Sequence, residues 1–545
     1  MNENEAIARR LDKYRQYLLL AVILAFSGYV RIRLLSVPLE RDEGEFAYFA
    51  QLILHGVPPY LDAYTLKLPG AALMYALFML MFGQSAWGIH LGLLVVNALT
   101  VIMVFLLGRR LFGSGAGATA AAAYAVLSLS QGVYGVFAHA THFVVLFALA
   151  GYLLLMRALE RGRTVTLLCS GLCFGLAILM KQHGIFFAVF ALLYFLWERR
   201  KFFRGEWQRP IRDGLLFAAA IVVPFGACSL WLFMSGAFGK FWFWTFQYAR
   251  EYVSSESFHT GARNFQRLFG RIVETSLYLW ALAGIGLVLL FADREAARGR
   301  LFAAGLLFFS FLAICPGLYF RRHYFIMLLP AIALLIGVAA GSARNVLARR
   351  GMGRLSWGIP ALLFLAIASY SVYQEREFFF SMDSDTASRM TYGDNPFPES
   401  VQVAQYIRAH SSPNDRIAVL GSEPQIYFYS GRLSATGHIY MYGLMENQKY
   451  APVMQQELIR EVESARPKFI VFVNVRSSWI IRPESQTLIF DWAKSYLEEN
   501  YVRVGIVDIL QDQTIYLWDD DAVGYSPRSA AFLEVYRRIH LLATD

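Results

Sequence analysis

Long apolar runs, many close to the length of a bilayer, constrain this chain more than any other feature. A helix needs about 20 mostly apolar residues to cross the hydrocarbon core. About eleven runs approach that length: residues 17–37, 86–108, 115–132, 140–157, 164–180, 183–198, 214–235, 276–292, 301–317, 323–341 and 356–373. The chain is 57% hydrophobic and only 17% charged, whereas soluble domains are about one-quarter charged. The sequence therefore predicts a polytopic α-helical membrane protein.

The basic residues indicate how the spans are oriented. The net charge of +10 could suggest nucleic-acid binding, but most of it lies in alternate short loops between apolar runs, which argues against that class. Cytoplasmic loops are enriched in Lys and Arg, so these loops are predicted to lie inside. The opposite set is predicted to lie outside: residues 38–85, 132–139, 181–182, 236–275, 318–322 and everything after 373. The charged N-terminus lacks a small-residue cleavage site, so the first span is predicted to be retained.

Several motifs of soluble enzymes are absent from the sequence. The four cysteines, at positions 169, 173, 228 and 315, lie in apolar segments, and no second pair completes a zinc site or a disulfide framework. No phosphate loop, dinucleotide fingerprint or nucleophile elbow occurs. A nucleotide-linked substrate is therefore not expected.

The chain changes character after residue 373. Apolar runs give way to alternating helix and strand patterns, with strands predicted at 416–421, 468–473, 502–510 and 514–519. We therefore predict two domains, a transmembrane domain over 1–373 and an α/β domain over 374–545. The odd number of spans places the second domain outside the cell membrane.

The first outer loop is acidic and partly helical. Glu40, Asp42, Glu43 and Glu45 follow the first span, and residues 45–56 have helical periodicity. Residues 68–83 are apolar but too short to span comfortably. Both pieces are predicted to lie at the membrane surface or to be re-entrant. The aromatic segment within 236–275 is also predicted to lie at the membrane surface.

Four short stretches resemble a known group. They are the pair Asp42-Glu43 after the first span, the element Lys67-Leu68-Pro69 before an apolar helix, RRHYFIMLLPAIALL at 321–335 and MKQHGIFF at 180–187. The order of these stretches, and their predicted position on the outer side of the membrane, resemble the GT-C glycosyltransferases. This group includes ArnT-like, family 39 and protein O-mannosyltransferase relatives. The family usually has Lys-Pro-Pro, so Leu68 is a departure.

The resemblance implies a fold and an activity. The fold is the GT-C fold of about eleven transmembrane helices with a C-terminal extracytoplasmic α/β domain. The activity is transfer of a sugar from a polyprenyl-phosphate donor to an acceptor hydroxyl on the outer face of a bacterial inner membrane, with inversion expected for a single displacement. Hydropathy alone does not imply this activity.

The resemblance also assigns the catalytic candidates. A positioned carboxylate must take the proton of the acceptor hydroxyl, whereas phosphate leaves readily without a second acid. Asp42 matches the family's acid and Glu43 is the second candidate; the alternative is that these acids cap a helix, which we favour for Glu45. Lys67 is assigned to the donor phosphate, the alternative being a lysine that snorkels to the interface.

Three further clusters are candidates for substrate contacts. Arg321, Arg322 and His323, with Tyr324 nearby, form a second candidate phosphate clamp, and lipid-headgroup anchoring is the equal alternative. Lys181 and Gln182, beside His183, can contact sugar or phosphate, or can simply form a tight turn.

His139 and His142 fall on one helical face. With Asp42 they form a candidate site for a divalent metal ion; alternatively they bind phosphate or sugar, or are ordinary satisfied polar residues. No cofactor is otherwise implied.

Two other functional classes remain open. A transporter or flippase of lipid-linked saccharides would also have many spans, but should place ionisable groups near the midplane and often shows repeated halves. A membrane scaffold whose outer domain binds partners would leave Asp42 and Lys67 without a common purpose. If Asp42 and Lys67 lie close together, the enzyme hypothesis is favoured over these two classes.

The sequence does not identify the sugar. It does not identify the acceptor either, which can be a lipid, a polysaccharide or a protein.

Overall fold

The computed structural model describes residues 3–200, 207–253 and 256–539 and divides into two compact units. The bundle unit comprises Met1–Leu35, His90–Cys228 and Glu256–Met382. The sheet unit comprises Ser36–Ile89, Ser229–Ser255 and Asp383–Asp545. The sheet unit thus takes in two segments that precede the C-terminal region. The domain boundary at residue 373 stays a prediction.

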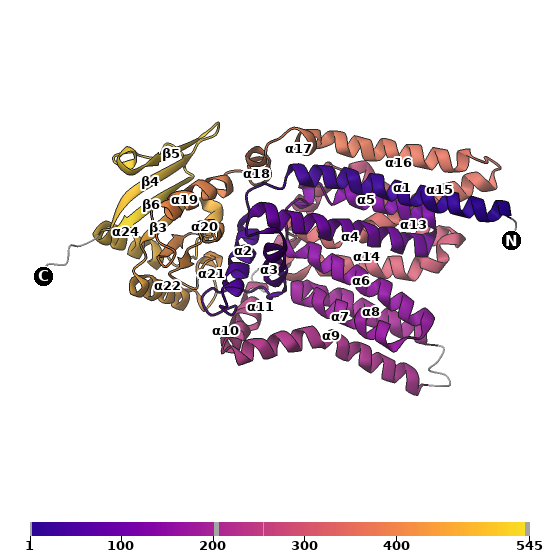
Figure 1. The fold of residues 1–545 in the computed structure, drawn as a ribbon, viewed down its shortest axis with the longest axis horizontal. Coiled ribbons are helices and arrows are strands. Elements are labelled where there is room, and N and C mark those ends of the chain that lie inside the picture. Colours follow the sequence, from indigo (N-terminus) through magenta and orange to yellow (C-terminus); the bar gives the residue numbers. More distant parts are fainter. Residues whose placement is uncertain (1–2, 201–206, 254–255, 540–545) are drawn as a thin grey trace. The chain divides into compact units, whose positions relative to one another are not determined.

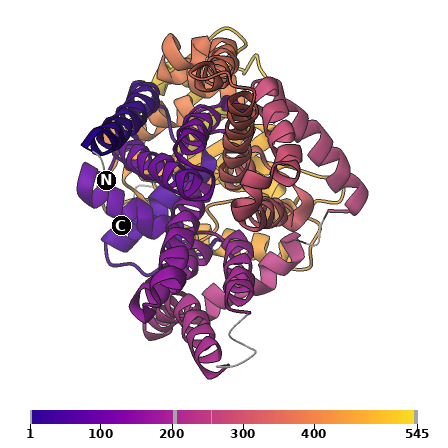
Figure 2. The same ribbon diagram turned by 90° about the vertical axis from the view of Figure 1, so that its right-hand side faces the viewer.

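Every predicted span is a helix in the structure, and the helices lie side by side (Figures 1 and 2). They are α1 (Glu3–Arg33), α4 (Ala86–Phe112), α5 (Ser114–Leu127), α6 (Ala140–Arg161), α7 (Thr164–Met180), α8 (Ile185–Arg199), α9 (Gln208–Met234), α13 (Leu277–Ala292), α14 (Ala297–Ile314), α15 (Leu329–Arg349) and α16 (Leu355–Gln374). Within the described residues, seven helical segments are long and apolar enough to cross a membrane by themselves. The number rises to eight if α12 (Phe258–Glu274) and α13 form one broken span. The chain bends by 106° between these two helices. The chain is a multi-span membrane protein.

Close backbone contacts place α15 at the centre of the bundle unit. It packs against α5, α13 and α16. A Cβ at Gly286 of α13 would lie 1.9 Å from the carbonyl oxygen of Leu335, and one at Gly337 would lie 2.4 Å from that of Ala116. Small residues let membrane helices approach this closely, and van der Waals packing then holds them together.

The sheet unit contains a six-stranded mixed sheet with the order β2-β1-β3-β6-β4-β5. Its strands are β1 (Arg416–Leu420), β2 (Leu433–Ser434), β3 (Phe469–Asn474), β4 (Tyr501–Ile509), β5 (Thr514–Trp518) and β6 (Phe532–Arg538). β1 pairs in parallel with β2 and β3, and the other pairings are antiparallel. The four predicted strands are confirmed, as is the α/β character, but β2 and the central β6 were not predicted.

Helices α19 (Phe397–Ala409), α20 (Gln425–Ser430), α22 (Ala451–Ala465) and α24 (Leu488–Asn500) accompany the sheet (Figure 1). The same unit holds α2 (Arg41–Leu54) and α3 (Gly70–Phe82), the two helical pieces of the first outer loop. It also holds α10 (Phe238–Trp242), a π-helical turn (Phe243–Tyr248) and α11 (Ala249–Val253). The acidic stretch is therefore built into the unit that contains the sheet.

Candidate functional site

Two of the four acidic residues start helix α2. The Glu40 carboxylate accepts from the backbone N–H of Glu43 at 2.9 Å, and the Glu43 carboxylate accepts from that of Glu40 at 3.1 Å. This capping box satisfies two N–H groups that a helix start leaves open. The Glu43 side chain is fully buried. Capping therefore falls to Glu40 and Glu43, not to Glu45, which we had expected to cap the helix.

The other two acidic residues hold a lysine between them. Lys67 Nζ lies 2.7 Å from Asp42 Oδ1 and 2.5 Å from Glu45 Oε2. Asp42 and Glu45 are three residues apart, so they share one face of α2. The side chains of Asp42 and Lys67 are 21% and 22% exposed, whereas that of Glu45 is 3% exposed. The structure thus brings Asp42 and Lys67 together and leaves both partly accessible.

Aromatic side chains enclose this ion-pair cluster of Asp42, Glu45 and Lys67. The Lys67 ammonium lies 4.6 Å from the ring centre of Phe46 and 5.5 Å from that of Tyr440. The Tyr440 hydroxyl donates to Asp42 Oδ1 at 3.3 Å. Sequence reasoning missed Tyr440, which lies 398 positions after Asp42. It also misassigned Glu45, although the spacing of Glu45 from Asp42 was a usable signal.

The electrostatics of the cluster keep the lysine charged. Burial alone would lower the pKa of Lys67, but attraction to Asp42 and Glu45 outweighs it and raises that pKa above its usual value. Burial raises the pKa of Glu45, with the charge of Lys67 opposing the rise. An ammonium group has three N–H donors, and two point at carboxylates here. The third is the one that an additional anion would use.

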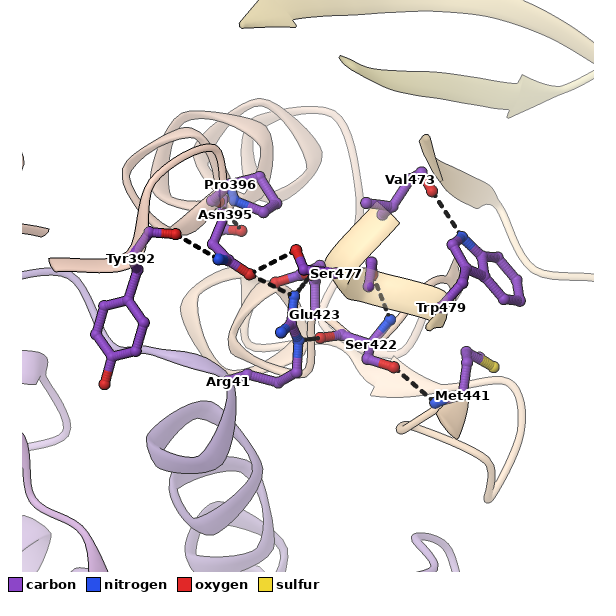
Figure 3. Close-up of polar contacts among 12 residues, drawn as sticks. Arg41, Tyr392, Asn395, Pro396, Ser422, Glu423, Met441, Val473, Ser477 and Trp479 are labelled. Atoms are coloured by element: carbon purple, nitrogen blue, oxygen red, sulfur yellow. Dashed lines mark hydrogen bonds and ion pairs between the residues drawn. The ribbon is translucent and has the colours of Figure 1, made fainter. Parts of the chain in front are cut away.

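A separate network fixes the first turn of α2 to the C-terminal part of the sheet unit (Figure 3). The Arg41 guanidinium forms an ion pair with Glu423 at 2.5 Å and donates to the carbonyl oxygen of Ser422 and to Asn395 Oδ1. It also donates to the Tyr442 hydroxyl at 2.9 Å. Because Arg41 precedes Asp42, these contacts set the position of the candidate base.

Helix α2 also packs directly on α20, which provides a test of this support. A Cβ at Gly44 would lie 2.6 Å from the backbone nitrogen of Gln425. We expect Gly44→Val to lower the free energy of unfolding by about 2 kcal/mol, because the added atoms overpack the contact. Gly239→Val in α10 is the matched control, since a Cβ there meets nothing within 4 Å. Thermal unfolding of the purified proteins measures both, and equal melting temperatures would contradict the assignment.

The bundle unit brings a second set of predicted residues together. The rings of His139 and His323 stack with centres 4.1 Å apart, and the Tyr324 ring lies 4.8 Å from that of His323. The Lys181 ammonium lies 4.4 Å from the centre of the Tyr324 ring, and the His183 ring is 5.0 Å from it. We call these five residues the histidine cluster. His183 was noted in the sequence only as a neighbour of Lys181.

The remaining predicted residues have more local surroundings. Arg322 donates to the carbonyl oxygens of Gly132 and Gln131 at 2.9 and 2.7 Å, so it supports a turn. Arg321 lies over the Tyr319 ring, and a short helical turn spans Gln182–Gly184.

His142 is buried in α6, one turn after His139. Asp42 belongs to the sheet unit, so the metal site of Asp42, His139 and His142 stays a prediction.

Comparison with known proteins finds sugar transferases that are similar to part of this chain. Residues 67–227 match the family model described as dolichyl-phosphate-mannose-protein mannosyltransferase. The undecaprenyl phosphate-alpha-4-amino-4-deoxy-L-arabinose arabinosyl transferase of Pseudomonas aeruginosa strain UCBPP-PA14 is 28% identical over 363 residues. That match covers 62% of this chain and 63% of the relative. The same enzyme of Pseudomonas paraeruginosa is also 28% identical, over 364 residues, with the same coverage.

Solved structures share the fold over nearly the whole chain. ArnT from Cupriavidus metallidurans bound to undecaprenyl phosphate aligns with a TM-score of 0.58 and 16% identity, covering 95% of this chain and 97% of ArnT. The archaeal oligosaccharyltransferase AglB from Archaeoglobus fulgidus, in complex with an inhibitory peptide and a dolichol-phosphate, aligns with a TM-score of 0.52 and 13% identity. That alignment covers 93% of this chain and 75% of AglB. The chain therefore has the fold of these ArnT and AglB structures, and its residues 67–227 match the mannosyltransferase family model.

Proposed function

We propose that this chain is a membrane glycosyltransferase that moves a sugar from a polyprenyl-phosphate donor to an acceptor hydroxyl. The observation that carries the proposal is the ion-pair cluster, in which a partly exposed carboxylate and a partly exposed ammonium lie 2.7 Å apart. The curated relatives named above use an undecaprenyl phosphate-linked sugar, as their names state. The alternation of basic loops supports a bacterial inner-membrane protein with the cluster on the outer face.

Asp42 acts as the general base in this proposal. The acceptor oxygen attacks the anomeric carbon as its proton passes to Asp42, and the bond from that carbon to the phosphate oxygen breaks. The polyprenyl phosphate leaves with the electron pair, and a single displacement inverts the anomeric centre. Glu43 takes no part, because both its burial and its capping bonds commit it to the helix start.

Lys67 holds the donor phosphate with its third N–H group. A charge-assisted hydrogen bond to a phosphate oxygen is strongest where the charge grows as the leaving group departs. Glu45 keeps the ammonium in place throughout, since it is buried and lies 2.5 Å from Lys67 Nζ. The predicted metal site of Asp42, His139 and His142 is part of the same proposal. So are the predicted substrate contacts of Lys181 and Gln182 and the predicted phosphate contacts of residues 321–324.

Reconstitution in vesicles tests the proposal against the transporter alternative. The purified protein is given a panel of polyprenyl-phosphate sugars together with an extract of envelope acceptors. We expect release of free polyprenyl phosphate with one donor class, in proportion to sugar transferred. Movement of intact donor across the vesicle membrane without cleavage would overturn the proposal in favour of a flippase.

A further inference from the structure

An arginine-lined cavity lies at the opposite end of the bundle unit from the histidine cluster. It measures about 700 Å³. Helix α15 begins just after Tyr324, and residues between Val338 and Asn345, from near its midpoint onward, line the cavity. A helix of 21 residues spans roughly 30 Å, so the two sites lie near opposite surfaces of the membrane. The loops at the cavity are those predicted to be cytoplasmic.

The cavity carries more positive than negative charge. Four guanidinium groups line it, from Arg15, Arg298, Arg344 and Arg354, against two carboxylates. Both carboxylates have other partners: Glu295 lies 2.7 Å from Arg349, and Asp293 accepts from Ser342 at 2.8 Å. Among the residues that the structure describes, Arg298, Arg344 and Arg354 form no ion pair.

Arg344 is held in place but is not satisfied. Its guanidinium lies 3.8 Å from the ring centre of Trp357, and its Nε is buried with no hydrogen-bond partner among the described residues. Trp357 in turn packs on Gly115, where a Cβ would lie 2.2 Å from the ring. A buried donor without an acceptor is costly, so this N–H group is a donor that an anion in the cavity would satisfy.

The start of α5 adds a second feature suited to an anion. Gly113, Ser114 and Gly115 line the cavity, and the helix start has no side-chain cap. The N–H groups of an uncapped helix start bind phosphate oxygens well, and the helix dipole favours negative charge there.

The walls of the cavity place it within reach of lipid. Helices α1 and α16 contribute Leu19 and Trp357, and each of these two spans is only 22% buried in the protein. Both helices contact α5. A molecule with a phosphate head and apolar chains can therefore place the head among the arginines and leave its chains along the exposed spans. We propose that this cavity binds the phosphate headgroup of an anionic phospholipid.

Lipid binding to the purified full-length protein tests the proposal. Native mass spectrometry compares phosphatidylglycerol with phosphatidylcholine. We expect wild type to retain one phosphatidylglycerol preferentially, and Arg344→Gln/Arg354→Gln to weaken its binding by about tenfold or more, since charge-assisted bonds are lost. Arg350→Gln is the matched control, because Arg350 is exposed on the same loop but does not line the cavity; it should bind as wild type does.

A second variant fills the cavity without changing its charge. Gly358 lines the cavity and a Cβ there meets nothing within 4 Å, so Gly358→Leu should exclude the headgroup and fold normally. Competition by millimolar inorganic phosphate would show a site for free anions and overturn the lipid assignment. Wild-type affinity in both cavity variants, or equal loss in Arg350→Gln, would overturn the site itself. None of these readouts depends on glycosyl transfer.

Discussion

Asp42→Asn is expected to reduce turnover by about a thousandfold while leaving donor binding and thermal stability nearly unchanged. Asparagine has the same shape, and its carbonyl oxygen can still accept from Lys67 and from Tyr440, which now contact Asp42 Oδ1 at 2.7 and 3.3 Å. It cannot take a proton at neutral pH. Steady-state transfer and donor binding, measured on the same preparation, separate the chemical step from the binding step.

The neighbouring carboxylate gives a matched control for this variant. Glu43→Gln weakens the capping box, so we expect a loss of about 1 kcal/mol in stability with turnover changed only a few-fold. Turnover at the wild-type rate in Asp42→Asn would remove Asp42 from the mechanism. A collapse of turnover in a folded Glu43→Gln protein would transfer the catalytic role to Glu43.

Lys67→Met is expected to affect both donor binding and folding. Removing the ammonium leaves Glu45, 3% exposed, without its charged partner, and breaking such a pair costs about 3 kcal/mol. It also removes the proposed phosphate ligand, so donor affinity should fall by at least about tenfold. Donor titration and thermal unfolding give the two quantities independently.

A double variant distinguishes the two effects of Lys67. In Lys67→Met/Glu45→Gln the buried charge is gone as well, so we expect most of the lost stability to return. Donor affinity should stay low, because nothing replaces the ammonium beside Asp42. Recovery of donor affinity together with stability would show that Lys67 acts only as a structural counter-ion.

The bundle was the most predictable part of the fold. Each predicted span is a continuous apolar run. Hydropathy was therefore enough to predict its position, and the structure has a helix at each one. Length was less informative: α8 has 15 residues and α13 has 16, and neither meets the length criterion for a single span.

The sheet was predicted in part, for a reason visible in its order. β1, β3, β4 and β5 are apolar or alternating runs with clear flanks, whereas β6 follows an irregular segment. Its partners β3 and β4 lie on either side of it, and strand pairings across such sequence distances leave no local signal. The two-residue β2 is too short for any periodicity.

The ion-pair cluster shows the same division between local and distant information. The side and spacing of Asp42 and Lys67, together with the resemblance, pointed to a shared location, and the structure places them 2.7 Å apart. Tyr440 was invisible because no pattern near residue 440 indicates a contact with α2. Glu45 was assigned to capping because acidic residues near a helix start usually stabilise its N-terminus. In the structure the Glu45 carboxylate instead forms an ion pair with the Lys67 ammonium.

The bond between Arg41 and Glu423 has a consequence for engineering this protein. The helix that carries Asp42 is bonded to residues nearly four hundred positions downstream, so the C-terminal region supports the proposed reaction centre. We expect deletion of that region to displace the proposed base. A grafted C-terminal region of a relative, used to change the acceptor, would need matching partners for Arg41 and a backbone that accommodates the close approach of Gly44.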